Sequence, residues 1–227
     1  MSSALGAAEE VAAHLRRRLD AGLRQIAFFI VPSAMAFLAL GGVITAVLFQ
    51  SGRFNAANSR YVWAILAGSA VGLLAQTLGR LYSSAYYALR DTRTPLRFAV
   101  VRVVLTTGLG YLCAIPLPHW IGVDPKWGVA GLTASAGVAG WVEFTLLRRT
   151  LNARIGRTGL PASLVARLWF AAAVAAATAW GVKGALGFRH PLSFGLVVIA
   201  AYGVVYIAAA WLLRVEECAA LVRRLRR

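Results

Sequence analysis

Residues 61–89 read YVWAILAGSAVGLLAQTLGRLYSSAYYAL, and their only charged side chain is that of Arg80. A bilayer core takes about 20 apolar residues as a helix. This stretch is therefore long and apolar enough to cross a membrane. Five further windows meet the same condition: residues 26–49, 98–115, 128–147, 168–186 and 192–213. The pattern predicts an all-α integral membrane protein with six transmembrane helices.

Composition agrees with a membrane protein. Of the 227 residues, 59% are hydrophobic and 14% are charged, and the net charge is +16. Soluble domains carry roughly a quarter charged residues. In a soluble protein such a positive excess would suggest a nucleic-acid partner. Here the basic residues cluster between apolar runs, which indicates topology signals and contact with anionic membrane lipids, and no nucleic acid.

The distribution of Lys and Arg predicts the orientation. Seventeen of these residues lie in the segments before the first window, after the second and fourth windows, and after the sixth. Five lie on the other side: four in the alternate connectors, and Lys183 near the end of the fifth window. Because cytoplasmic loops carry the excess of basic residues, both termini are expected in the cytoplasm. The chain is thus expected to be a multi-pass protein of the bacterial inner (cytoplasmic) membrane.

The two ends of the chain differ from the apolar windows. Residues 1–25 repeat an apolar side chain every four positions at Val11, Leu15, Leu19 and Leu23, which predicts an amphipathic link on the cytoplasmic face. No signal peptide is expected, because two glutamates occupy its place. Four domains are predicted: the link at 1–25, a four-helix part at 26–160, two additional transmembrane helices at 161–213 and a basic tail at 214–227.

The second window carries a polar stripe. Its members are spaced by seven, four, three and four residues, so at 100° per residue they fall within roughly 60° of one helix face. They are Ser69, Gln76, Arg80, Ser83 and Tyr87. An ionisable residue inside a membrane suggests a functional site by default. We expect the stripe to line a cavity, and the alternative is that Arg80 extends to the inner interface and the serines bond to their own helix.

Two further intramembrane charges accompany this stripe. Arg102 lies only five residues after Arg97, so extension of its side chain to the interface is favoured over a substrate contact, although both stay open. Glu143 has three possible roles: an ion pair with Arg102, an ion pair with Arg148, or proton coupling. A structural ion pair is the favoured interpretation.

Small residues and one proline indicate how the helices pack. Gly68 and Gly72 form a small-xxx-small pair beside the stripe, and the motif GVAG occurs at both 128–131 and 137–140. Such glycines allow helices to approach closely in a membrane. Pro32, inside the first window, frees a carbonyl and predicts a kink, which is either structural or part of a gate.

The sequence gives no sign of an enzyme. It contains no nucleophile–histidine pair, no carboxylate pair on one predicted face and no phosphate-binding glycine loop with a lysine. The histidines are scattered and the two cysteines have no metal-ligand spacing, so neither a metal nor a cofactor is expected.

Several short motifs resemble one known family. The chain has VPSA at 31–34, LFQSGRF at 48–54 and YYALRDTRTP at 86–95, and in this order and spacing they resemble the MurJ/MviN family of lipid II flippases. That family belongs to the multidrug/oligosaccharidyl-lipid/polysaccharide exporter superfamily. The motif positions are Pro32, Phe49, Gln50, Gly52, Phe54, Tyr87, Asp91, Thr92, Thr94 and Pro95. The strong matches span about residues 22–98.

The resemblance implies a fold and an activity. Members have fourteen helices in two lobes and move an undecaprenyl-pyrophosphate-linked peptidoglycan precursor across the inner membrane by alternating access. The chain resembles helices nine to fourteen, so an N-terminal lobe of helices one to eight is an expected partner and the chain is expected to be a fragment. Arg80 matches a basic position of the tenth helix. Some relatives hold sodium in the helix matching 98–115, where this chain has Gly110 and no carboxylate.

The expected function is therefore that of a lipid II flippase half, with Arg80, Gln76, Ser69, Ser83, Tyr87 and Arg102 as substrate-binding residues. The expected ligand is lipid II or a similar polyprenyl-pyrophosphate glycolipid. Two alternatives remain open. One is a flippase for another lipid-linked oligosaccharide or a drug exporter of the same superfamily. The other is a non-transporting membrane scaffold module.

Overall fold

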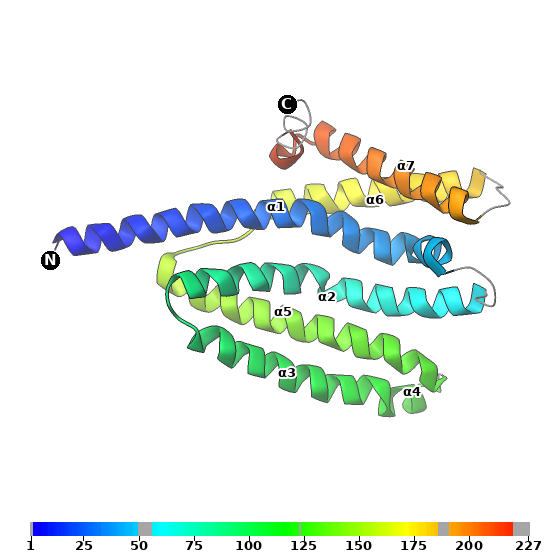
Figure 1. Ribbon diagram of the computed structural model, residues 1–227, viewed down its shortest axis with the longest axis horizontal. Coiled ribbons are helices and arrows are strands. Elements are labelled where there is room, and N and C mark those ends of the chain that lie inside the picture. The colour runs from blue at the N-terminus through cyan, green and yellow to red at the C-terminus, as the bar shows by residue number, and fades with distance from the viewer. Residues whose placement is uncertain (1, 50–55, 123, 186–190, 220–227) are drawn as a thin grey trace.

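The computed structural model describes residues 2–49, 56–122, 124–185 and 191–219 as a bundle of long helices (Figure 1). The elements are α1 Ser2–Phe49, α2 Ala56–Ala88, α3 Arg93–Ala114, α4 Pro116–Trp120, the 3₁₀ helix η1 Pro125–Trp127, α5 Gly128–Ile155, α6 Ala162–Ala185 and α7 Pro191–Leu212. Six of them are long and apolar enough to cross a membrane, and they coincide with the six predicted windows. The predicted all-α membrane fold is confirmed.

The helices form two packing units that share α1. The first unit is a layer in which α2 and α3 both pack on α5, while α2 and α3 barely touch each other. The second unit is the pair α6 and α7. The helix α1 packs on α2 from one side and on α6 and α7 from the other, and it lies between the two units in Figure 1. Among the described elements, α3 is the least buried of the six long helices.

Glycine lets α2 and α5 approach until their backbones touch. A Cβ added at Gly72 would collide with the Cα of Gly137, and a Cβ at Gly137 would lie 2.8 Å from the amide nitrogen of Gly72. Two hydrogen bonds cross the same interface: Thr133 Oγ1 donates to the Ile65 carbonyl at 3.2 Å, and Trp141 Nε1 donates to the Val71 carbonyl at 2.8 Å. The predicted helix–helix seam is therefore the α2–α5 interface.

Gly128 and Gly131 of α5 lie against α3. A Cβ at Gly128 would collide with the carbonyl oxygen of Ala114, and a Cβ at Gly131 would lie 3.0 Å from the Cβ of Cys113. The two GVAG motifs of α5 thus serve two different neighbours, the first facing α3 and the second facing α2. This places α2, α5 and α3 in a fixed order.

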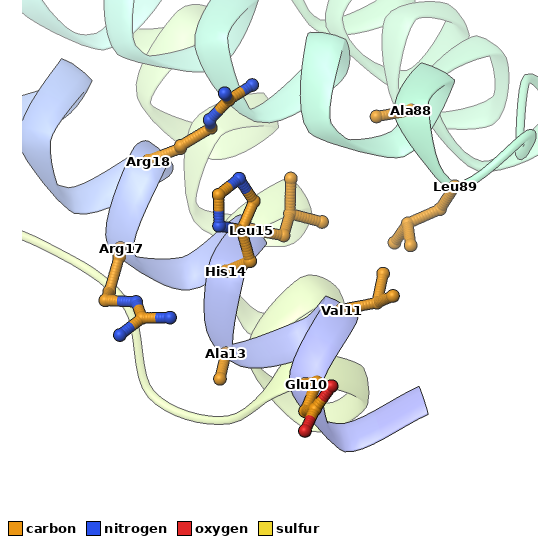
Figure 2. Close-up of a pocket in the computed structure, with 9 residues that line it drawn as sticks. All are labelled: Glu10, Val11, Ala13, His14, Leu15, Arg17, Arg18, Ala88 and Leu89. Carbon is orange, nitrogen blue, oxygen red and sulfur yellow. The ribbon is translucent and has the colours of Figure 1, made fainter. Parts of the chain in front are cut away.

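The first 25 residues are not a separate helix in the structure. Helix α1 continues without a break through residue 25, because no proline and no glycine pair interrupts it there. Leu19 and Leu23 are buried in the bundle, whereas Val11 is exposed. Beside the end of α2, this half of α1 borders an open hollow of about 780 Å³, which is lined by residues between Glu10 and Arg18 and by Ala88 and Leu89 (Figure 2).

The segments expected on one side of the membrane meet at one end of the bundle. Arg154 of α5 pairs with Asp91 in the α2–α3 connector, and the amide of Gly159 after α5 donates to Asp20 of α1 at 3.0 Å. Arg24 of α1 pairs with Glu216, which follows α7. The basic segments therefore share one end of the molecule.

The seam makes a prediction for stability. Gly72→Ala should lower the free energy of unfolding by about 1–3 kcal/mol, because the new methyl group meets the α5 backbone, which cannot move aside cheaply. The matched control is Gly79→Ala in the same helix, where nothing lies within 4 Å of the added Cβ. There the change should be neutral or stabilising by up to about 1 kcal/mol. The thermal midpoint of each purified variant in detergent measures its change in stability. Equal changes in the two variants would contradict the close approach of α2 and α5 at Gly72.

Candidate anion-binding groove

An open groove of about 310 Å³ lies where α2, α3 and α5 meet. Gln76 and Arg80 of α2 border it, and so do Arg102 and Thr106 of α3. Val103, Thr107 and Ala136 complete its lining. Three of the six predicted substrate-binding residues thus line the same groove: Gln76 and Arg80 from α2, and Arg102 from α3.

The two arginines of the groove differ in their partners. Arg102 Nη1 donates to Glu143 Oε2 of α5 at 3.2 Å, so the ion pair expected as one option for Glu143 is present. The carboxylate side chain is only 12% exposed, whereas that of Arg102 is 44% exposed. Arg80 is exposed and forms no ion pair within the part of the chain that the structure describes. Its guanidinium is therefore available to an anion.

The remaining members of the polar stripe lie elsewhere. Ser69 is half-buried and its hydroxyl donates to the Ile65 carbonyl of its own helix at 3.0 Å, as in the alternative interpretation. Ser83 and Tyr87 do not line the groove, and Tyr87 is 56% exposed near the end of α2. The members of a stripe on one helix can have different neighbours, because α5 covers only part of α2 and α3 barely touches it.

Val103 and Thr107 line the groove but were not predicted from the sequence. They follow Arg102 and Thr106 directly and repeat the same spacing of four, so α3 presents two adjacent rows to the groove. The doublet Thr106-Thr107 was the available signal. Gly110 of α3 is buried, and a Cβ added there would meet Leu132 and Ser135 of α5.

The groove has the chemistry of anion recognition. A guanidinium offers planar, charge-assisted hydrogen bonds that match the oxygens of a phosphate, and it stays charged at any physiological pH. Gln76, Thr106 and Thr107 add neutral hydrogen-bonding groups. Among the described residues, no group of three or more His, Cys, Asp or Glu side chains is placed to hold a metal ion.

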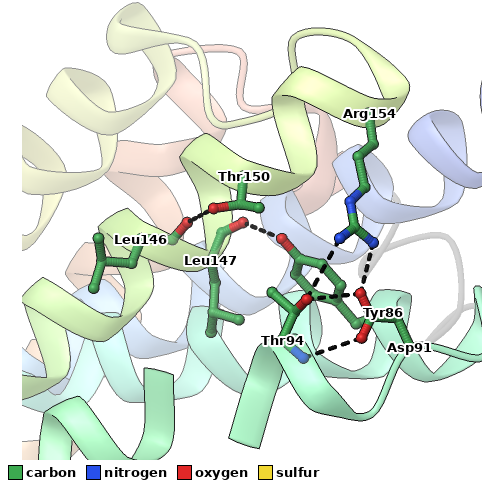
Figure 3. A network of polar contacts seen from close by, with 7 residues as sticks. All are labelled: Tyr86, Asp91, Thr94, Leu146, Leu147, Thr150 and Arg154. Atoms are coloured by element: carbon green, nitrogen blue, oxygen red, sulfur yellow. Dashed lines mark hydrogen bonds and ion pairs between the residues drawn. The ribbon is translucent and has the colours of Figure 1, made fainter. Parts of the chain in front are cut away.

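A polar network at one end of the bundle holds the three helices of the groove together (Figure 3). Arg154 of α5 donates to Asp91 Oδ2 at 2.6 Å, and its guanidinium carbon lies 5.5 Å from the ring centre of Tyr86 in α2. The Tyr86 hydroxyl donates to the Leu147 carbonyl of α5 at 3.1 Å. Asp91 also accepts from the amide of Thr94 at 3.0 Å and from its hydroxyl at 2.7 Å, which caps the start of α3.

This network explains the motif at 86–95. The α2 helix ends in a turn in which Arg90 has a φ of 58° and the amide of Asp91 donates to the Tyr86 carbonyl at 3.0 Å. Thr92 precedes the first residue of α3, and Pro95 lies in its first turn, where a missing amide hydrogen costs nothing. The residues from Leu89 to Pro95 thus end one helix and begin the next, while Tyr86 bonds α2 to α5.

The charge of Asp91 is secured by its partners. Hydrogen bonds from the hydroxyl and amide of Thr94, together with the bond from Arg154, hold the pKa of Asp91 well below its usual range. The carboxylate therefore stays ionised and keeps α3 attached to α5. Of the other motif residues, Pro32 lies inside α1 and Phe49 ends it, while Gln50, Gly52 and Phe54 lie outside the described residues.

Comparison with known proteins connects this geometry to a family. The family model described as "Lipid II flippase MurJ" matches residues 1–190. A probable lipid II flippase MurJ of Rhizobium meliloti (strain 1021) is 30% identical over 195 residues, which cover 81% of this chain and 34% of that protein. The lipid II flippase MurJ of Burkholderia cenocepacia is 33% identical over 136 residues, covering 60% of this chain and 24% of that protein.

A solved structure is similar as well. The lipid II flippase MurJ in an inward closed conformation superposes with a TM-score of 0.72 at 16% identity, covering 97% of this chain and 42% of that one. At that identity the likeness shows the fold. The chain spans about a third of the length of the first relative and two fifths of the solved structure. The family match over residues 1–190, together with the shared helical fold, establishes that this chain belongs to the lipid II flippase MurJ family.

Proposed function

We propose that the chain forms one lobe of a lipid II flippase and that its groove binds the pyrophosphate of the lipid carrier. The observation that carries this proposal is an exposed Arg80 beside Arg102 in an intramembrane groove. A charged side chain at the centre of a transmembrane helix costs about 2.5–3.5 kcal/mol on insertion scales. A function that needs the charge accounts for this cost, whereas contact with acyl chains does not.

The two arginines have different roles in this proposal. Arg80 makes the first contact with the phosphate oxygens, because no carboxylate among the described residues competes for it. Arg102 is paired with Glu143, and it binds the anion by exchanging the carboxylate oxygen of Glu143 for a phosphate oxygen. Gln76 and Thr106 donate hydrogen bonds from the sides of the groove. Transport of this kind needs no covalent chemistry.

The size of the groove limits what it holds. A volume of about 310 Å³ is at the lower end of small-molecule sites. It is suited to a phosphate group and is too small for a complete glycopeptide headgroup. We therefore propose that an N-terminal lobe of helices one to eight supplies the rest of the cavity, and that rocking of the two lobes exposes it to alternate sides of the membrane.

The topology belongs to the same proposal. The end of the bundle that carries the network around Asp91 is placed in the cytoplasm with both termini, in agreement with the excess of basic residues there. Residues 1–25 and 214–227 are the cytoplasmic link and tail, 26–160 the four-helix part of the lobe and 161–213 the two additional helices. Ser69, Ser83 and Tyr87 of the stripe are proposed to contact other parts of the substrate.

Specific features weigh against the alternative functions. An exporter of cationic drugs is disfavoured because two arginines and one carboxylate leave the groove positive. A scaffold module is disfavoured because the groove is open at Arg80. A flippase for another lipid-linked oligosaccharide shares the same pyrophosphate, so a direct comparison of headgroups in a transport assay separates it from a lipid II flippase.

The first prediction of the proposed function concerns Arg80. Expression of the native gene should restore growth to bacteria depleted of their lipid II flippase, and Arg80→Ala should abolish this rescue, because the first guanidinium that meets the phosphate is lost. Arg80→Lys should rescue partially, since the charge remains without the planar fork. The matched control is Arg97→Ala, which removes one exposed guanidinium from α3 outside the groove. Full rescue by Arg80→Ala would remove this residue from the mechanism.

The second prediction concerns Glu143. In the purified chain in lipid nanodiscs, Glu143→Gln should raise the affinity for undecaprenyl pyrophosphate several-fold, because the carboxylate no longer competes for Arg102. Glu216→Gln, which makes the same change in net charge at the exposed pair with Arg24, should leave the affinity unchanged. Titration monitored by native mass spectrometry measures both. Weaker binding by the Glu143 variant would contradict the exchange of partners.

A further inference from the structure

Helix α1 is the connection between the two packing units. It packs on α2 of the first unit and on both helices of the second. Pro32 lies near the middle of this helix, where it faces α7. Any bend of α1 at the proline would therefore change how the pair α6–α7 is placed against the first packing unit, which carries the groove.

The proline leaves a carbonyl without its helical donor. In an α-helix, the amide of residue 32 would bond the carbonyl of Phe28, and proline has no amide hydrogen. The Tyr206 hydroxyl of α7 donates to this Phe28 carbonyl at 2.7 Å. One residue later, the Ser33 hydroxyl donates to the Phe29 carbonyl at 2.8 Å. The freed turn is thus supplied with donors from α1 itself and from α7.

A second tyrosine of α7 reaches the same turn. Tyr202 lies one helical turn before Tyr206 and its hydroxyl donates to the carbonyl of Pro32 at 2.8 Å. Both tyrosine side chains are buried, at 6% and 5% exposure. A hydroxyl buried in this apolar interface needs a partner, and a carbonyl without a donor in a membrane costs several kcal/mol. The Tyr206 hydroxyl and the Phe28 carbonyl therefore satisfy each other, and the Tyr202 hydroxyl finds its partner in the Pro32 carbonyl.

We infer that Tyr206 and Tyr202 are positioning residues that fix the geometry of α1 around Pro32 and thereby set the position of α6–α7 relative to the first packing unit, which carries the groove. Tyr206 replaces the donor that the proline removed. Tyr202 adds a second point of attachment one turn away. Together the two hydroxyls restrain how far α1 can bend at this turn and in which direction. This inference concerns the mechanics of the chain and does not depend on the identity of the transported anion.

The two tyrosines are expected to differ in their dependence on the proline. The Phe28 carbonyl regains an amide donor in Pro32→Ala, so the hydroxyl of Tyr206 becomes dispensable there. The Pro32 carbonyl can accept from its own helix in either background, so the contribution of Tyr202 should be the same in both. A purely structural packing role of Tyr206 would not depend on residue 32.

This dependence is measured as a double-mutant cycle. In the otherwise native chain in detergent, Tyr206→Phe should lower the thermal midpoint by about 2–4 °C, as expected for one lost buried hydrogen bond in a chain of this size. In the Pro32→Ala background the same change should have little effect. Tyr111→Phe, at a tyrosine of α3 that is 64% exposed, is the matched control.

The position of the helices gives a second measurement. Spin labels at Val11→Cys of α1 and Trp211→Cys of α7, both exposed, report on the angle between the two helices. The native cysteines, Cys113 and Cys218, are replaced by alanine. Double electron–electron resonance should show one narrow distribution of label-to-label distances for the parent and for Tyr111→Phe, and a broader one for Tyr206→Phe. Equal broadening with proline and with alanine at position 32, or no broadening, would overturn the inference.

Discussion

The central constraint on this molecule is that a guanidinium inside a bilayer must face water or a partner. Two arginines lie within the apolar helices α2 and α3, and the structure directs both toward one groove. One of them is paired with Glu143, and the other is exposed. The arrangement of the three helices meets this requirement. Both α2 and α3 pack on α5 without covering each other, and the groove lies in the space between them.

Two features keep the groove open. Glycine on both sides of the α2–α5 seam brings these backbones together, and a separate pair of glycines on α5 receives α3. At one end, Asp91 and Arg154 fasten the start of α3 to α5, while Tyr86 fastens α2 to the same helix. The helices are thus fixed along their length by close approach and at their end by charge. Within the described residues the second unit packs mainly on α1, where the Phe28 carbonyl freed by Pro32 accepts a hydrogen bond from Tyr206 of α7.

Much of this could be predicted from the sequence, for physical reasons. Runs of apolar residues longer than a bilayer is thick identify membrane helices, so all six were found. Close approach needs glycine, so the seam was found as well, and an intramembrane carboxylate near an arginine suggested the pair of Arg102 with Glu143. Helical periodicity places Ser69, Gln76 and Arg80 on one face, but it does not say which neighbour covers each turn. Ser69 therefore bonds to its own helix.

Other features depend on tertiary contacts that periodicity does not contain. The continuity of α1 through residue 25 arises because Leu19 and Leu23 pack against the bundle rather than on lipid headgroups. The bonds from Tyr202 and Tyr206 to α1 join residues about 170 positions apart in sequence. From the sequence, Asp91 was recognised only as part of a motif. Its hydrogen bonds to Thr94 and its ion pair with Arg154 are seen only in the structure.

The claim that the groove contains water within the bilayer is tested most directly by cysteine accessibility. Thr106→Cys, in the groove, and Val104→Cys, 64% exposed on α3 outside it, are compared in a chain without native cysteines in lipid nanodiscs. A water-soluble thiol reagent should modify the cysteine at 106 rapidly, and undecaprenyl pyrophosphate should slow that reaction, while the cysteine at 104 stays unreactive among acyl chains. Rapid modification at 104 with none at 106 would contradict the account.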